Sequence, residues 1–310
     1  MASPTDTPLV SVILPTWNRA ALLPRSAGSV LTQAGPSLEL IIVDDGSTDD
    51  TEAVVRALGD DRIRYLCRDH RGGGAAARNT GLAAARAHLV AFQDSDDEWR
   101  PDKLERQFAA LQSQGPETRV VYTGFDRVGP EGAEYIPNRD RFAKREGDLL
   151  RALQGENFIS TQTLLAPRAL LVEIGGFDEA LGRFQDWDLA LRLARRTRFA
   201  LLDEPLVTQH VIPGSITSDG KAGLEALTRI TEKNLDVLQE DPAFLAARRT
   251  LLGHQRCLGG DPLGARIEFR RALAATPGHP RALAGLLLSR LGSWGYRRAL
   301  GFLGRETGPI

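Results

Sequence analysis

The chain has 310 residues, of which 42% are hydrophobic and 25% charged, so it can bury a full core and lacks the composition of a disordered protein. Its formal net charge of -1 disfavours nucleic acid as a partner, because binding a phosphate backbone calls for a basic field. The two cysteines, Cys67 and Cys257, lie far apart in the sequence, which predicts reduced thiols and not a disulfide framework or a zinc site.

The sequence predicts neither a secretory signal nor a membrane-spanning helix. The apolar run near the N-terminus has no basic residue before it and stops at Pro15, which does not fit a signal peptide. The longest apolar stretch, 282–294, is shorter than the ~20 residues that a spanning helix needs, and it contains Arg290. We therefore expect a cytoplasmic protein.

Strands and helices alternate along the first part of the chain. Short apolar runs predict buried strands at 10–14, 38–43, 63–66 and 89–92. The segments between them have apolar residues at helical spacing or, at 75–87, a run of alanines. This alternation predicts an α/β fold with a Rossmann-like, mainly parallel sheet and helices on both faces.

The pattern is less regular beyond residue 100. A helix is expected after Pro101, strands at 120–122, 158–165 and 201–207, a helix after Asp186, and helices only from residue 224 onward. The segment 124–155 is rich in charges and glycine and predicts a long loop. We expect a large domain over 1–218, with halves at about 9–123 and 124–218, followed by a helical region over 219–310.

Carboxylates are concentrated where the predicted strands end. In a parallel α/β sheet, ligands bind at the carboxyl ends of the strands, which here are the segments 15–18, 44–47 and 94–97. The tripeptide Asp94-Ser95-Asp96 offers hard oxygen ligands for Mg²⁺ or Mn²⁺ beside a diphosphate. Taken alone, the tripeptide is equally consistent with a polar turn.

Four segments carry a family resemblance: VSVILPTWNRA, LIIVDDGSTDDT, GGGAAARNTGLAAAR and VAFQDSDDEWRPDKL. In this order they resemble glycosyltransferase family 2, whose members have the GT-A fold, and the likeness covers about residues 9–215. It implies an inverting enzyme of polysaccharide biosynthesis that depends on Mn²⁺ or Mg²⁺. The donor would be a nucleoside-diphosphate sugar, UDP-linked by family frequency, and the acceptor a hydroxyl of a growing glycan or lipid-linked saccharide.

The resemblance also implies a set of nucleotide-binding residues: Pro15, Thr16, Trp17, Asp45, Arg78 and Asp94. Trp17 stands where Tyr is more usual, and stacking on the base survives that exchange. Asp45 would accept a hydrogen bond from the base, Arg78 would face the phosphates and Asp94 would lie near the ribose. Asp96 would bind the metal directly.

A later segment, VEIGGFDEALGRFQDWDLALRL, resembles the acceptor-side block in which an acidic pair precedes Trp and the aspartate is the catalytic base. Asp186 matches that base. The pair usually reads Glu-Asp and here reads Gln185-Asp186, so one carboxylate is absent. Without the resemblance, Asp186 is more simply interpreted as a helix cap. With it, Asp186 would take the acceptor proton while the metal stabilises the departing diphosphate, and inversion would result.

The segment VTQHVIPGSITS resembles the part of the family in which a histidine lies near the diphosphate. His210 is therefore a candidate metal ligand or phosphate contact, and a packing role is equally open. An arginine commonly precedes this histidine, where the present chain has Gln209.

The C-terminal region contains one segment, 260–277, with the spacing of the second helix of a tetratricopeptide repeat. One repeat cannot bury its own faces, so we expect these helices to pack on the catalytic domain, with a protein partner or an oligomer through them left open. The last segment mixes Leu and Trp with Arg, so peripheral association with the inner face of a membrane is also open, although a docked terminal helix is favoured.

One alternative function belongs to a different class, a non-catalytic nucleotide-sugar or glycan-binding protein on the same fold. Gln185 and Gln209 favour it, whereas the retained carboxylates of Asp45, Asp96 and Asp186 argue against it. A dehydrogenase is disfavoured because no G-x-G-x-x-G follows the first strand.

Overall fold

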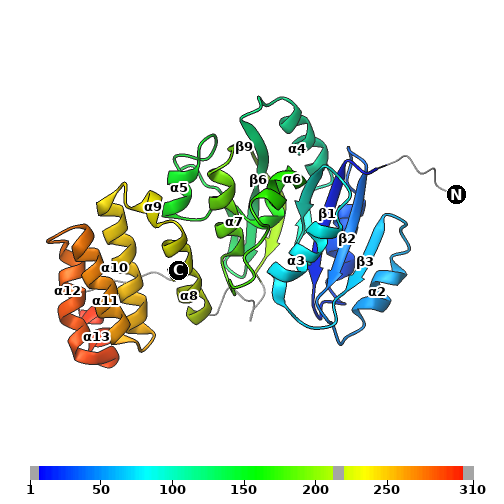
Figure 1. Cartoon of the computed structure of the whole chain (residues 1–310). Helices are drawn as coiled ribbons and strands as arrows, with labels where there is room; N and C mark the ends of the chain where they lie inside the picture. The colour runs from blue at the N-terminus through cyan, green and yellow to red at the C-terminus, as the bar shows by residue number, and fades with distance from the viewer. Residues whose placement is uncertain (1–6, 212–219, 303–310) are drawn as a thin grey trace. The chain divides into compact units, whose positions relative to one another are not determined.

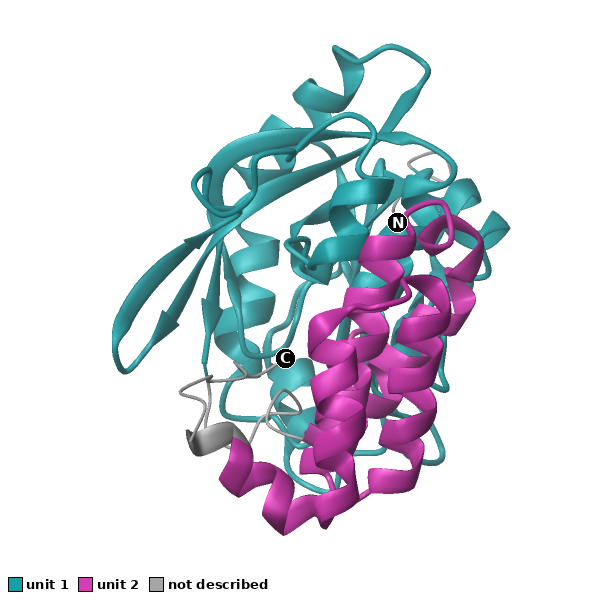
Figure 2. Ribbon diagram, turned by 90° about the vertical axis from the view of Figure 1, so that its left-hand side faces the viewer, with its two compact units in different colours: residues 1–180, 185–215 teal, residues 181–184, 216–310 magenta. Residues whose placement is uncertain are grey.

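The fold is that of a computed structural model, which describes residues 7–211 and 220–302. The chain forms two compact units (Figure 2): Met1–Ala180 with Gln185–Ser215, and Leu181–Phe184 with Ile216–Ile310. The sequence predicted a division at 218/219 and did not predict that the short segment 181–184 groups with the C-terminal helices. We call the two parts unit 1 and unit 2.

Unit 1 is built on a nine-stranded sheet of order β3-β2-β1-β4-β8-β6-β9-β5, with β7 paired to β6. The first four strands are β1 (Val10–Thr16), β2 (Leu38–Asp44), β3 (Ile63–Cys67) and β4 (Leu89–Phe92). They pair in parallel, as the alternation predicted. The helices that connect them are α1 (Leu23–Leu31), α2 (Thr51–Ala57) and α3 (Gly73–Ala84), and Figure 1 shows this half in blue and cyan.

The second half of the sheet is mixed. Its strands are β5 (Glu98–Trp99), β6 (Thr118–Gly129), β7 (Gly132–Ile136), β8 (Leu164–Pro167) and β9 (Arg198–His210). Its helices are α4 (Lys103–Gln112), α5 (Leu150–Gly155), α6 (Arg168–Glu173) and α7 (Gln185–Ala194). Strand β8 pairs antiparallel to both β4 and β6, whereas β6 and β9 are parallel. The sheet is therefore wholly parallel only over β1 to β4, the part in which strands and helices alternate regularly in the sequence.

The prediction of a long loop over 124–155 is wrong over most of its length. Strand β6 continues to Gly129 and forms a hairpin with β7, and α5 follows. Three side chains of this segment are held by Asp203 of β9, which accepts hydrogen bonds from Tyr135, Arg139 and Arg145 at 2.6–3.1 Å. These contacts order a segment whose composition alone indicates a loop.

The predicted strand over 158–165 is also only partly right. Residues 161–163 form a 3₁₀ turn, and β8 begins at Leu164. The turn is closed by the backbone amide and the hydroxyl of Thr163, which both donate to the carbonyl oxygen of Ser160, at 3.0 and 2.6 Å. The run is buried throughout, which is why its periodicity resembles that of a strand.

Over its described residues, unit 2 is helical, as predicted. Its helices are α8 (Gly220–Lys233), α9 (Leu235–Leu238), α10 (Pro242–Leu258), α11 (Pro262–Ala275), α12 (Pro280–Leu288), the 3₁₀ turn η3 (Ser289–Leu291) and α13 (Gly292–Phe302). Asp241 and Asp261 cap α10 and α11 by accepting hydrogen bonds from the amides of Phe244 and Gly264, and each helix has proline in its first turn.

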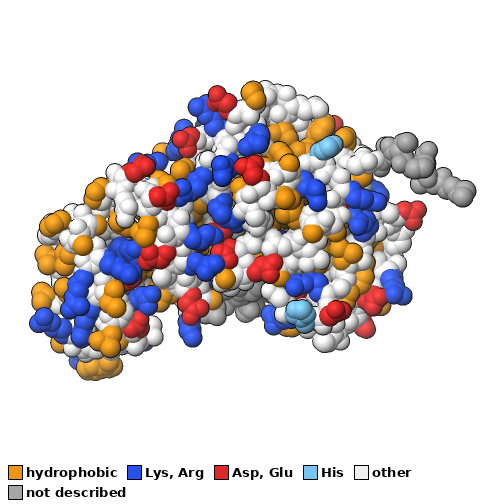
Figure 3. All heavy atoms as spheres, viewed as in Figure 1, with side chains coloured by type: hydrophobic (Ala, Val, Ile, Leu, Met, Phe, Trp, Pro, Cys, Tyr) orange, Lys and Arg blue, Asp and Glu red, His pale blue; other side chains and the backbone are white. Residues whose placement is uncertain are grey.

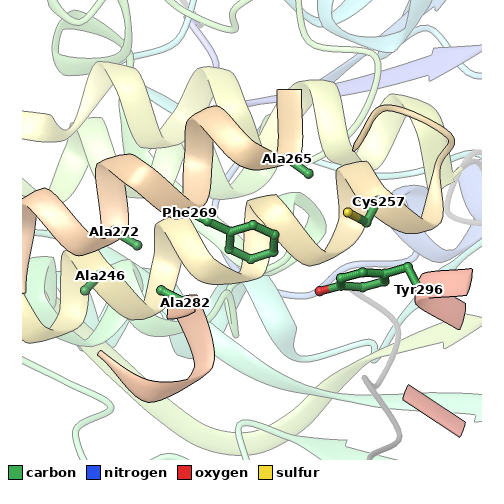
Figure 4. Packing of buried hydrophobic residues seen from close by; sticks show 7 residues of the cluster. All are labelled: Ala246, Cys257, Ala265, Phe269, Ala272, Ala282 and Tyr296. Carbon is green, nitrogen blue, oxygen red and sulfur yellow. The ribbon is translucent and has the colours of Figure 1, made fainter. Parts of the chain in front are cut away.

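Phe269 of α11 lies at the centre of a small hydrophobic core in unit 2 (Figure 4). Its ring packs against backbone in two neighbouring helices, because Gly253 of α10 and Gly285 of α12 leave no side chain in its way. His254 completes this core: its ring meets that of Phe269 edge-on at 5.3 Å, and its Nδ1 is hydrogen-bonded to the hydroxyl of Tyr296.

Unit 2 also exposes large apolar side chains on its last helices. The exposed ones between 262 and 302 are Leu263, Ile267, Leu283, Leu287, Leu291 and Trp294, the last 75% exposed. The same stretch contains seven arginines and a single acidic residue, Glu268. Figure 3 shows hydrophobic and basic side chains side by side over α11, α12 and α13. No helix in the described ranges is both long and apolar enough to cross a membrane.

Candidate active site

Asp45, at the end of β2, anchors the entry to α3. Its buried carboxylate accepts hydrogen bonds from the amides of Gly72 and Gly73 at 2.6–3.0 Å and from Nη1 of Arg68 at 2.8 Å. Gly73 has a φ of 84°, which a residue with a side chain rarely adopts. The glycine run is therefore a fixed helix start, with Asp45 as the acceptor for its free amides. The predicted contact of Asp45 with a nucleobase would be made in addition to these bonds.

Trp17 directly follows β1, and its aromatic ring is partly exposed and partly covered. Its side chain is 38% exposed, and the guanidinium carbon of Arg71 lies 3.6 Å from the ring centroid. The two preceding predicted residues, Pro15 and Thr16, are buried at the strand end, where the Thr16 hydroxyl has no hydrogen-bond partner among the described residues. An aromatic face and an orphaned hydroxyl at one strand end suit a flat heterocyclic ligand.

Arg78 connects the two halves of the site. Its Nη2 donates to Oδ1 of Asp94 at 2.5 Å, and its Nη1 donates to Oε1 of Gln185 at 3.1 Å. Asp94 follows β4, and Gln185 is the first residue of α7. The guanidinium, whose side chain is 12% exposed, thus joins the donor half predicted from the sequence to the helix that carries Asp186.

Three aspartates, Asp94, Asp96 and Asp97, follow β4 within four residues. Burial raises the pKa of the Asp96 carboxyl above its usual range, and the charge of Asp94 adds to that shift. The Asp96 carboxylate pairs with Arg19, whose Nη2 lies 3.9 Å from Oδ2. Asp97 is structural instead: it accepts hydrogen bonds from Nε2 of Gln162 at 2.7 Å and from the His210 amide at 2.9 Å.

His210 ends β9, and its ring faces Glu98. Its Nε2 lies 3.1 Å from Oε2 of Glu98, and its backbone amide is held by Asp97. Glu98 and His210 come together because β5 pairs antiparallel with β9. The structure gives no contact between His210 and Asp96, so a metal role for His210 stays a prediction.

The donor set suits a divalent ion that is shared with a diphosphate. Within residues 7–211 and 220–302, no three His, Cys, Asp or Glu side chains are arranged as a complete protein cage for a metal. Mg²⁺ typically takes only one or two carboxylates and fills its shell with phosphate oxygens and water. Asp94 and Asp96 provide such carboxylates. The charge of a bound cation would favour the ionised form of Asp96, whose pKa is raised by burial and by the charge of Asp94.

Asp186 lies in the first turn of α7 and accepts a hydrogen bond from the amide of Trp187 at 2.8 Å. Burial raises the pKa of its carboxyl, and the charge of Asp94 adds to this, whereas the Trp187 amide and Arg78 oppose it. A raised pKa suits a general base that must take and release a proton. The neighbouring Asp188 pairs at 2.7 Å with Arg192, one helical turn later, and Trp187 belongs to the core.

The sequence did not reveal several partners of the predicted residues. Arg71 covers the Trp17 ring, and Arg25 donates to the carbonyl oxygen of Asp96 at 2.5 Å. Gln162 holds Asp97 from the turn before β8. Each of these residues is far in sequence from the residue that it contacts, and only the tertiary structure brings the two together.

Known proteins resemble this chain in sequence and in fold. Residues 11–172 match the sequence profile of "Glycosyl transferase family 2". An uncharacterized glycosyltransferase of Rickettsia prowazekii (strain Madrid E) is 30% identical over 220 residues, covering 70% of this chain and 69% of that protein. The Escherichia coli UDP-Glc:alpha-D-GlcNAc-diphosphoundecaprenol beta-1,3-glucosyltransferase WfgD is 41% identical over 106 residues, covering 34% and 42%. The structure of S. aureus TarS 1–349 in complex with UDP-GlcNAc has a TM-score of 0.67 at 20% identity, covering 96% and 93%, a likeness of fold.

Proposed function

Because the chain belongs to glycosyl transferase family 2, we propose that it transfers a sugar from a nucleoside-diphosphate sugar to a hydroxyl acceptor with inversion at the anomeric carbon. That it is a glycosyltransferase with a GT-A fold follows from the family and the fold. The proposed donor and mechanism are supported mainly by the hydrogen bonds of Arg78. They connect Asp94, which follows β4, to the start of α7, the helix that contains Asp186. This arrangement supports a donor diphosphate on one side and a base on the other.

In this proposal Asp186 is the catalytic base. Its carboxylate takes the proton of the acceptor hydroxyl while the acceptor oxygen forms a bond to the anomeric carbon and the bond to the diphosphate oxygen breaks. The leaving diphosphate needs no proton, so one carboxylate is sufficient, unlike in a hydrolase with two catalytic carboxylates. The raised pKa of Asp186 supports this role.

Asp96 and Asp94 would hold Mn²⁺ or Mg²⁺ together with the diphosphate, and His210 is a further candidate ligand. When bound, the ion would supply the positive charge that stabilises the leaving diphosphate. Arg78 would add a fixed cation on the same side. The exposed ring of Trp17 would stack on the base, and Asp45 and Thr16 would supply its polar contacts.

We propose a uridine donor and a lipid-linked saccharide acceptor. The name of the relative WfgD gives UDP-Glc as its donor and alpha-D-GlcNAc-diphosphoundecaprenol as its acceptor, which supports both choices. The side chains of Trp17, Asp45 and Thr16 do not themselves select uracil, so donor identity is a matter for a screen of UDP-, GDP- and dTDP-sugars.

Peripheral membrane binding through unit 2 would bring the enzyme to such an acceptor. The exposed apolar side chains of α11 to α13 lie in a stretch with seven arginines and one glutamate. Apolar groups that enter the lipid, surrounded by cations that meet phosphate headgroups, favour an anionic bilayer surface as the partner.

Co-sedimentation of the full chain with phosphatidylglycerol and phosphatidylcholine vesicles tests this partner. We expect binding to the anionic vesicles that falls with added salt, and a marked loss of binding in the double variant Leu287→Ser with Trp294→Ser. Val172→Ser, an exposed apolar position in unit 1, is the control and should bind as wild type does. Equal binding to both vesicles, or no binding to either, would contradict the proposal and leave an acidic protein as the better partner.

Release of nucleoside diphosphate from UDP-, GDP- and dTDP-sugars tests the catalytic proposal. Asp186→Asn should lower kcat by about 10²–10⁴, the usual contribution of a general base. Asp148→Asn is a matched control, because Asp148 also accepts a backbone amide at a helix start, that of Leu150 at 3.1 Å, and should keep wild-type activity. Equal activity of the two variants would reduce Asp186 to a helix cap and overturn its assignment as the base.

A further inference from the structure

Gln185 precedes the proposed base, and its side chain contacts Arg78. Its amide oxygen accepts the hydrogen bond from Nη1 of Arg78, while Nη2 of the same guanidinium donates to Asp94. Of these two partners only Asp94 is charged. The amide of Gln185 therefore fixes the orientation of the guanidinium without neutralising it.

Gly74 leaves the space in which this contact forms. It lies one helical turn before Arg78 in α3, and long side chains in a helix point back over the preceding turn. A Cβ atom at residue 74 would lie 2.9 Å from Nη1 of Arg78 and 3.6 Å from Oε1 of Gln185. The first distance is too short for an unstrained contact. The bare backbone at Gly74 thus permits the guanidinium to sit between its two partners.

The charge at residue 185 matters because the surroundings are already acidic. Asp94 contacts Arg78 and is followed in the chain by Asp96 and Asp97, and Asp186 follows Gln185 directly. A glutamate at this position, which is the usual residue of the Glu-Asp pair, would keep the hydrogen bond and the side-chain length but would place a second negative charge on Arg78. The cation would then be offset twice, which would weaken its attraction for a diphosphate.

We propose that Gln185 is a positioning residue: its neutral amide oxygen holds Arg78 in the space left by Gly74, so that the charge of Arg78 remains available to the donor diphosphate. This inference rests on the proposed function, since the diphosphate is its ligand. It assigns to Gln185 and Gly74 a role in donor affinity that neither residue would have as part of a helix start.

Two substitutions of Gln185 separate charge from shape. Gln185→Glu keeps the length and the acceptor, and should raise the donor KM about fivefold to tenfold, as one added like charge in a partly solvated site would. Its kcat should stay within about twofold of wild type if the base is otherwise undisturbed. Gln185→Met keeps the length without the acceptor and should raise the KM as well. A purely structural role predicts instead that Gln185→Glu behaves as wild type.

Gly74→Ala tests whether the space beside residue 74 is needed to position the Arg78 guanidinium. We expect weaker calorimetric binding of whichever of UDP, GDP and dTDP the wild type binds best, because the guanidinium is displaced. Gly28→Ala is the matched control: Gly28 is also a helical glycine in unit 1, and a Cβ atom there would meet nothing within 4 Å. Unchanged affinity in Gly74→Ala would overturn the proposal.

A failure of the proposed transferase function can be distinguished from a failure of the role proposed for Gln185. A wild-type chain that binds none of the three nucleotides would contradict the transferase assignment. The position of Arg78 is then tested by the free energies of unfolding in urea of Gly74→Ala, Gln185→Ala and the double variant. If Gly74 makes room for the Arg78–Gln185 contact, the two substitutions are not additive. Additive losses would refute this positioning of Arg78 irrespective of activity.

Discussion

Asp186 is a carboxylate whose position costs stability. Its pKa is raised in the folded chain by burial and by the charge of Asp94, so the ionised form is disfavoured there relative to the unfolded chain. Relative to the unfolded chain, the folded chain favours the protonated carboxyl of this residue. This contribution to stability is present below the unfolded pKa of about 4 and is lost as the pH rises through the folded pKa. At neutral pH the ionised side chain is therefore a cost that is kept for function.

We predict that Asp186→Asn raises the melting temperature of the chain at pH 7 while it removes turnover. The acid limb of the kcat profile of the wild type should also have its midpoint above the usual range of an aspartate, because the base must be ionised. Calorimetric melting of both proteins and a pH series of nucleotide release measure these effects. A variant less stable than wild type at pH 7 would contradict the proposed cost of burying this charge.

His254 makes a residue-scale prediction for unit 2. Burial lowers its pKa to about 4, and Arg281 adds to the shift. The unfolded chain therefore binds the proton more tightly, and stability is lost as the pH falls from about 6.5 toward 4, by at most about 3 kcal/mol.

Hydrogen exchange of the full chain at pH 7 and pH 5, corrected for the intrinsic pH dependence, reports this loss. Protection of the α10 and α11 amides should fall at the lower pH, and His254→Phe should reduce that dependence. Exchange in these helices that shows the same protection at both pH values would contradict the prediction.

The positions of the candidate site residues at strand ends and at a helix start could be predicted from the sequence, whereas their side-chain partners could not. Asp45, Arg78 and Asp94 follow from motifs that end or succeed predicted strands, and Asp186 from a motif at a helix start. The partner of His210 is different, because Glu98 meets it only through the pairing of β5 with β9. A sequence pattern carries no record of a contact made across 112 residues.

At the scale of elements, the close packing of helices on Phe269 explains the glycines of unit 2. A Cβ atom at Gly253 would lie 2.6 Å from Cε1 of the Phe269 ring. Alanine favours a helix over glycine by about 1 kcal/mol, but overpacking a core costs about 1–3 kcal/mol. The second effect is larger where the ring cannot move away.

We therefore predict that Gly253→Ala destabilises unit 2, whereas Gly28→Ala, with open space at its Cβ, stabilises unit 1 by about 0.5–1 kcal/mol. Urea unfolding of each variant, monitored by hydrogen exchange in α10 and in α1, gives the sign of the change in the free energy of unfolding for each unit. The same sign in both would show that helix propensity alone decides the outcome.

Local sequence pattern predicted the elements of the parallel half and the helical character of unit 2, because apolar or alanine-rich runs mark these strands and helices. It failed over 124–155, where β7 is largely exposed and the order comes from ion pairs with Asp203. The Oδ1 of Asp203 is reached by Arg145 across 58 residues and by Tyr135 across 68. Such a segment has the composition of a loop until its partner strand is in place.

At the scale of the whole molecule, the two units supply different functions in our account. Unit 1 provides the family fold and the residues for donor binding and proton transfer. Unit 2 provides exposed apolar and basic groups for a surface on which a lipid-linked acceptor would reside. At its strand ends, unit 1 would bind a nucleoside diphosphate together with a divalent ion, which is our central claim.

Calorimetric titration of UDP, GDP and dTDP, with and without Mn²⁺, on the wild type and on Asp96→Ala tests that claim most directly. We predict that one nucleotide binds with an affinity that Mn²⁺ raises at least about tenfold, and that the gain disappears in Asp96→Ala while Asp148→Asn keeps it. Binding of no nucleotide in either condition, or a Mn²⁺ effect that survives in Asp96→Ala, would contradict the account.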